Sequence, residues 1–228
     1  MRRGAIAGTV LAMGLATSVT ACGGSTSTID PRALLAQAKQ KVDRSSAVHF
    51  DLTSRGVTGN GTVITGGNGD IVRPDQIQGT FQLTVGGFTV SVKVVAAHGK
   101  FFAQAPFQTG YTATDPATYG VGNPALLIDP NTGLSSLLPA IDNPRAQGQT
   151  RVGGELLDQV GGTVPGTKIP VLPDAQPSQP VDVTALVDPS NHELRRIVLT
   201  GPFTSSTPST FTVTLTHYGE AVHIALPG

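Results

Sequence analysis

Strict alternation of apolar and polar residues in two adjacent segments, 80–85 and 88–94, most constrains what this chain can fold into. Gly86 and Gly87 separate the two segments, and a Gly-Gly pair is typical of a two-residue hairpin turn. Successive side chains of a strand point to opposite faces, so the pattern predicts an antiparallel hairpin with one apolar side and one water-facing side. Its apolar positions are Phe81, Leu83, Val85, Phe88, Val90, Val92 and Val94.

The same period of two recurs near both ends of the chain, at Val48, Phe50, Leu52, Ile197, Leu199, Phe211, Val213 and Leu215. These segments predict further strands of one antiparallel sheet with a wet side. The glycine-rich pieces 59–61 and 66–69 predict hairpin turns, and 151–164 predicts a short hairpin. Residues 165–180 contain five prolines, which favour a loop or an irregular crossover.

Helical signals are confined to two places. Asp30 is a candidate N-cap and Pro31 suits the first turn of a helix that carries Leu34, Leu35, Ala38 and Val42. In the central segment 120–141 we expect two short helices, at Pro124–Ile128 and Gly133–Leu138. There the helical spacing of four apolar residues predicts a single apolar face, made of Leu134, Leu137, Leu138 and Ile141.

The N-terminus is typical of a secretory signal. Arg2 and Arg3 precede an uncharged stretch, 4–19, which is shorter than the roughly 20 residues of a spanning helix. Cys22, the only cysteine of the chain, follows Val-Thr-Ala and makes this sequence similar to a bacterial lipobox. We therefore expect a lipoprotein signal peptide at 1–21, lipidation of Cys22, a flexible tether at 22–29 and a single domain at 30–228. The alternative is an ordinary signal peptide followed by an incidental cysteine.

Charge and composition exclude several classes of partner. The chain has 15 basic and 15 acidic side chains and no Lys/Arg cluster, so nothing predicts binding to nucleic acid or a polybasic membrane patch. Because no cysteine follows Cys22, the domain cannot use disulfides and depends on its hydrophobic core.

The sequence offers no catalytic constellation, so we expect a protein that is not an enzyme. The only close pair among its five histidines is His217 and His223, whereas a zinc site needs three or four ligands. There is no Gly-x-Ser-x-Gly motif, and residues 161–168 only approach a phosphate-binding loop. We expect no metal and no cofactor, and interpret the histidines as structural or surface residues.

Several segments together resemble the mycobacterial LppX/LprAFG lipoproteins over nearly the whole chain after Cys22. The resemblance rests on the lipobox cysteine Cys22, the opening helix, Ser46–Phe50, the hairpin around Gly86-Gly87, the central segment Leu127–Leu138 and Thr214–Val222. The central segment is the most specific of these. Thr214–Val222 resembles the closing strand, turn and strand of the family.

The resemblance implies an α+β fold. Its single, strongly curved antiparallel sheet forms a half-barrel, and helices packed over its concave face enclose an apolar cavity. It implies a cargo of acylated glycolipid or wax-like lipid, carried from the plasma membrane toward the outer envelope. The partners would be that lipid and, through Cys22, the extracytoplasmic face of the plasma membrane. An envelope lipid transporter is an open candidate partner.

Cavity lining is expected at the apolar positions of the sheet and the central segment: Phe81, Leu83, Val85, Val90, Val92, Leu134, Leu137, Leu138, Phe211 and Val213. Phe81 is favoured, and its bulk is expected to narrow the cavity. For each residue the alternative is ordinary core packing, since apolar side chains are usually buried. The matching alternative function is a membrane-tethered structural or accessory lipoprotein with a filled core and no lipid cargo.

Overall fold

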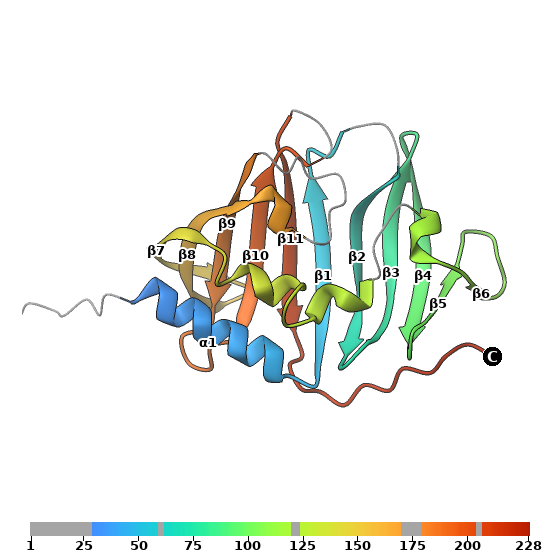
Figure 1. Ribbon diagram of the computed structural model, residues 1–228, viewed down its shortest axis with the longest axis horizontal. Helices are drawn as coiled ribbons and strands as arrows, with labels where there is room; N and C mark the ends of the chain where they lie inside the picture. Colours follow the sequence, from blue (N-terminus) through green and yellow to red (C-terminus); the bar gives the residue numbers. More distant parts are fainter. Residues whose placement is uncertain (1–28, 59–61, 120–123, 170–178, 204–206) are drawn as a thin grey trace, which may run out of the picture.

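The computed structural model describes residues 29–58, 62–119, 124–169, 179–203 and 207–228. In this part of the chain, eleven strands form one antiparallel sheet in the order β6-β5-β4-β3-β2-β1-β11-β10-β9-β8-β7 (Figure 1). The sheet is open, and β6 and β7 are its edges. The strands are β1 Ala47–Arg55, β2 Thr62–Val72, β3 Gln76–Val85, β4 Phe88–Ala97, β5 Lys100–Gln104, β6 Thr112–Ala113, β7 Asp142–Val152, β8 Glu155–Pro165, β9 Pro180–Val187, β10 Leu194–Gly201 and β11 Ser209–Thr216.

The predicted hairpin at Gly86-Gly87 is confirmed, with Val85 paired to Phe88. Both glycines have positive φ, +55° and +86°, which is the backbone that a tight two-residue hairpin turn requires. The predicted hairpin at 151–164 is also present, but its strands β7 and β8 reach back to Asp142 and forward to Pro165. The sequence pattern did not predict the part of β7 before Arg151. This edge strand is exposed along most of its length, so it has no alternation of apolar residues.

The prediction of a turn at Gly66–Gly69 is wrong, because these residues lie inside β2. Their glycines permit close packing of neighbouring strands: a Cβ on Gly67 would lie 2.8 Å from Cδ1 of Phe81, and one on Gly69 would lie 2.6 Å from Cα of Gly79. Glycine inside a strand marks such close approaches as well as turns. The other predicted turn, at 59–61, lies outside the described residues.

The predicted N-terminal helix is α1, Pro31–Arg44. The carboxylate of Asp30 accepts hydrogen bonds from the backbone N–H groups of Arg32 and Ala33, at 2.9 and 3.3 Å, as an N-cap does. The apolar stripe of α1 is buried, and the helix contacts β7, β9 and β10. Both central helices are present as 3₁₀-helices, η2 Pro124–Ile128 and η3 Leu134–Leu137; η1 Pro116–Tyr119 and η4 Gly166–Lys168 complete the described helices.

The chain ends differently from the expected strand, turn and strand. β11 ends at Thr216, a turn follows, and residues 220–228 form no strand. The turn is held by Tyr218, whose hydroxyl donates a 2.7 Å hydrogen bond to the Leu194 carbonyl. Burial raises the pKa of Tyr218 above its usual range, so this donor keeps its proton. Most of the proline-rich segment 165–180 lies outside the described residues.

Candidate functional site: an apolar pocket under the central segment

A pocket of about 250 Å³ lies between the sheet and the central segment that contains η2 and η3. We call the face of the sheet that borders this pocket the inner face. β1 to β5, β10 and β11 contribute side chains to the pocket, and Leu126, Leu127, Ile128, Leu134 and Leu137 line it from the central segment. Thr132 is the only described lining residue with a polar side chain, and none is charged. Such a surface can hold hydrocarbon.

Seven of the ten residues predicted from the sequence border the pocket: Phe81, Leu83, Val92, Leu134, Leu137, Phe211 and Val213. The structure thus brings together side chains from the β3–β4 hairpin, the central segment and the last strand. That these residues contact a lipid remains a prediction.

The other three predicted residues lie outside the pocket. Val85 is the last residue of β3 and is 45% exposed. Val90 is half-buried against the core, and Leu138, one residue beyond η3, is buried in the core itself. Sequence reasoning also missed lining residues such as Phe50 and Leu52, although the same alternation that singled out Phe81 marks both.

Two aromatic rings form part of the pocket wall. Phe50 on β1 and Phe81 on β3 lie on opposite sides of β2, where they pair with Gly69 and Gly67 respectively. Because neither glycine has a side chain, the two rings meet across β2 and stack, with their centroids 5.7 Å apart and an angle of 29° between their planes. The glycines of β2 therefore shape the pocket.

A polar network attaches the central segment to α1. The carboxylate of Asp43 accepts hydrogen bonds from the Ser135 hydroxyl and from Lys39 Nζ, each at 2.6 Å. Lys39 also donates to the Pro130 carbonyl at 2.7 Å, and Ser135 is wholly buried. Asp43 thus fixes η3 beside the C-terminal end of α1.

The turn between η2 and η3 is closed by Asp129. Its carboxylate accepts hydrogen bonds from the Thr132 hydroxyl at 2.9 Å and from the backbone N–H groups of Asn131 and Thr132 at 2.9 and 2.8 Å. The Thr132 hydroxyl, followed by these two N–H groups, holds the pKa of Asp129 below its usual value. The turn therefore keeps its ionised acceptor at neutral pH.

We expect Asp43→Ala to lower the free energy of unfolding by about 1–3 kcal/mol, because the buried Ser135 hydroxyl loses its acceptor. Asp43→Asn keeps an acceptor oxygen and should lose less. Urea denaturation gives the stability, and hydrogen exchange at 129–138 shows whether the central segment loosens. Equal stability of the alanine variant and the parent would contradict a fastening role for Asp43.

A second group of titratable residues lies on the opposite face of the sheet. His49 Nδ1 is 2.7 Å from Asp70 Oδ1, and the ring of His49 meets that of His217 edge-on, with centroids 5.6 Å apart. Asp51 Oδ2 is 3.8 Å from His49 Nε2. Within the described residues, no group of three or more His, Cys, Asp or Glu side chains has an arrangement that could hold a metal ion.

The chain is similar to known proteins over most of its length. The sequence model of the LppX_LprAFG lipoprotein family matches residues 30–224, which is most of the chain. This chain belongs to that family. It is 24% identical over 202 residues to the lipoarabinomannan carrier protein LprG of Mycobacterium tuberculosis strain H37Rv, a match covering 87% of this chain and 82% of LprG. The LprG of Mycolicibacterium smegmatis is 26% identical over 224 residues, covering 92% and 90% of the two chains.

Solved structures show the same fold for this family member. The crystal structure of LprF from Mycobacterium bovis superposes with a TM-score of 0.72 at 17% identity, covering 86% of this chain and 96% of LprF. The lipoprotein LppX of Mycobacterium tuberculosis gives a TM-score of 0.62 at 17% identity, covering 86% and 98%. No helix among the described residues has both the length and the apolar character needed to cross a bilayer.

Proposed function

We propose that this lipoprotein binds the acyl chains of a lipid or glycolipid in the pocket under the central segment and carries them from the plasma membrane toward the outer envelope. The observation that carries the proposal is the lining of the pocket, in which Thr132 is the single polar side chain among the described residues. Burial of hydrocarbon there would contribute about 25 cal/mol for each Å² of apolar surface removed from water. The relatives named lipoarabinomannan carriers support a glycolipid cargo.

The size of the pocket bears on how cargo would enter. A volume of about 250 Å³ is below the roughly 300–1,000 Å³ of typical small-molecule sites, so a long acyl chain requires more room. We infer that η2 moves outward during loading, because the neighbouring η3 is fastened to α1 through the hydrogen bond between Ser135 and Asp43. Leu126 on η2 lines the pocket and is 53% exposed, which places it at the rim.

The experiment is extraction of the full-length protein, purified from a host that makes acylated envelope glycolipids, followed by mass spectrometry of the extract. We expect an acylated lipid in near-equimolar amount. An extract without lipid, from protein that folds normally, would instead support the alternative of an accessory lipoprotein with a filled core.

Membrane attachment is proposed to depend on Cys22, which lies outside the described residues. Each buried CH₂ of an acyl chain contributes about 0.8 kcal/mol, and two or more chains anchor a protein stably. Cys22→Ala should therefore release the protein from membranes, without lowering its melting temperature, because the matched domain begins at Asp30. Fractionation of cells is the measurement; a cleaved variant that stays fully membrane-bound would contradict the lipid anchor.

A further inference from the structure

The tip of the β3–β4 hairpin presents apolar side chains to solvent. Phe88 is 78% exposed and Val85 is 45% exposed, and the two are paired directly across the turn at Gly86-Gly87. This turn projects at one end of the sheet (Figure 1). The two side chains form one contiguous exposed apolar patch, and such patches can mark interaction sites.

The tip is the outer end of an apolar strip that begins in the pocket. Three cross-strand pairs make up the strip: Phe81–Val92, Leu83–Val90 and Val85–Phe88. Alternate residues of a strand share a face, so all six side chains lie on the inner face. Phe81 and Val92 are 5% and 4% exposed at the pocket, Val90 is half-buried, and exposure is greatest at the tip. Hydrocarbon could therefore follow a continuous apolar surface from the tip to the pocket.

The charge around the hairpin suits a lipid surface. No Asp or Glu occurs between Asp75 and Asp115, so the β3–β4 hairpin carries no carboxylate side chain. Lys93 lies midway along β4, and Lys100 lies beyond the end of β4 that is far from the tip. Carboxylates near an anionic bilayer would be repelled, so their absence from the hairpin suits contact with such a surface. Apolar side chains such as Phe and Leu are the ones that interfacial segments bury at the boundary between headgroups and acyl chains.

We propose that the tip formed by Val85 and Phe88 inserts into the interfacial region of an anionic lipid bilayer and passes acyl chains along the strip to the pocket. A bilayer fits better than a protein partner because the strip leads to an apolar cavity that a bilayer can supply with hydrocarbon. The transfer of acyl chains to the pocket rests on the proposed lipid-carrying function. Insertion of the tip into a bilayer can be measured independently of that function.

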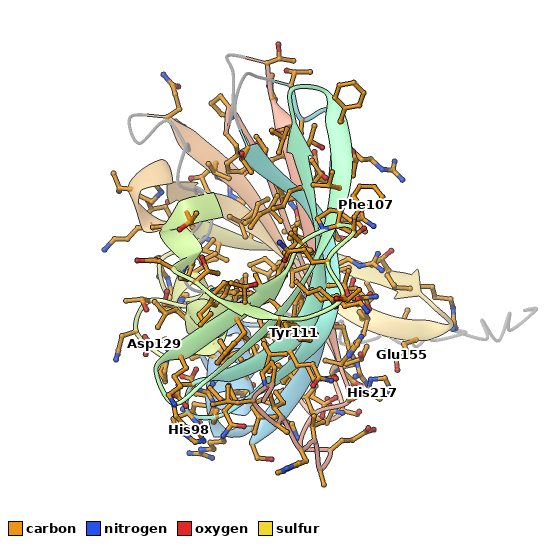
Figure 2. The ribbon with its side chains drawn as sticks, turned by 90° about the vertical axis from the view of Figure 1, so that its right-hand side faces the viewer. His98, Phe107, Tyr111, Asp129, Glu155 and His217 are labelled. Carbon is orange, nitrogen blue, oxygen red and sulfur yellow. The ribbon has the colours of Figure 1, made fainter. Side chains whose placement is uncertain are left out.

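The absence of tryptophan from the sequence allows a direct test. The full chains with Phe88→Trp and with Phe107→Trp each carry a single indole. Phe107 is fully exposed in the loop between β5 and β6, below the upper end of the β3–β4 hairpin, and serves as the matched control (Figure 2). Both variants have the same N-terminus, so attachment to vesicles through a lipid anchor would affect both in the same way.

Each variant is mixed with vesicles of equal parts phosphatidylglycerol and phosphatidylcholine, with or without bromine on the acyl chains. We expect the Phe88→Trp variant to show a blue shift and several-fold stronger quenching by brominated chains than the Phe107→Trp variant. Equal quenching of the two variants, or no quenching of the Phe88→Trp variant, would overturn the proposal.

A double variant, Val85→Ser with Phe88→Ser, separates the tip from the pocket. Both side chains are exposed, so the melting temperature should not change, and the pocket remains intact. We expect the rate of lipid loading from vesicles to fall several-fold while the final lipid content stays the same. An unchanged loading rate would overturn the role of the tip and leave the carrier function standing. A parent chain that never takes up lipid would refute the carrier function. The difference in quenching between the Phe88→Trp and Phe107→Trp variants would then test only whether the tip inserts into the bilayer.

Discussion

Phe211→Lys should lower the free energy of unfolding by at least about 3 kcal/mol, whereas Thr212→Lys should change it by less than about 0.5 kcal/mol. Phe211 is 1% exposed, and its ring meets that of Phe203 edge-on with centroids 5.1 Å apart. Removing such a ring leaves a cavity, and the ammonium group that replaces it would be buried without a partner. Thr212 is the next residue of β11, so its side chain points to the opposite face.

Urea denaturation followed by circular dichroism measures both variants against the parent. Val213→Lys belongs to the same series: Val213 lies at the pocket but is only half-buried, so we expect a smaller loss of stability together with loss of bound lipid. Similar denaturation midpoints for the Phe211 and Thr212 variants would show that the face assignment of β11 is wrong.

Alternation in the sequence identified several strands that have one buried and one water-facing side. It identified β3, β4 and β11 and most of β1 because their apolar side chains occur at every second position. It failed for β2, where glycines replace the side chains that would have shown the period. It also failed for the outer part of β7, an edge strand with little to bury.

The same reasoning predicts which face a side chain occupies but not how deep it lies. Phe81 and Val85 are on one face of β3, yet Phe81 is buried at the pocket and Val85 is exposed at the tip. Depth depends on what covers each position, and the cover comes from a distant segment. The hydrogen bond between Ser135 and Asp43 joins residues 92 positions apart, and no local pattern in the sequence predicts it.

The family resemblance predicts what the pattern could not, namely a cavity in addition to a packed core. The pocket between the sheet and the central segment has a volume of about 250 Å³, which is small beside a glycolipid with several acyl chains. The stacked rings of Phe50 and Phe81 occupy part of the space over β2. Filling the pocket with a larger side chain therefore distinguishes a lipid site from a packed core.

Val92→Trp is expected to abolish lipid binding with little loss of stability. Val92 lines the pocket, so the larger indole can extend into space that is empty or occupied by cargo. We expect co-purified lipid to fall about tenfold, which corresponds to roughly 1.4 kcal/mol of binding free energy or more. The free energy of unfolding should change by less than about 1 kcal/mol, below the usual cost of overpacking. Leu83→Trp, on the neighbouring strand and also at the pocket, should behave in the same way.

Val183→Trp is the matched control, because Val183 is 1% exposed in the core and does not border the pocket. There the same change overpacks a filled region and should cost about 1–3 kcal/mol, or roughly 2–4 °C of melting temperature for each kcal/mol. Thermal denaturation and lipid extraction of both variants give the comparison. If Val92→Trp destabilises the protein as much as Val183→Trp and the parent carries no lipid, the space beside Val92 is part of a packed core. The chain would then be an envelope lipoprotein with a structural role.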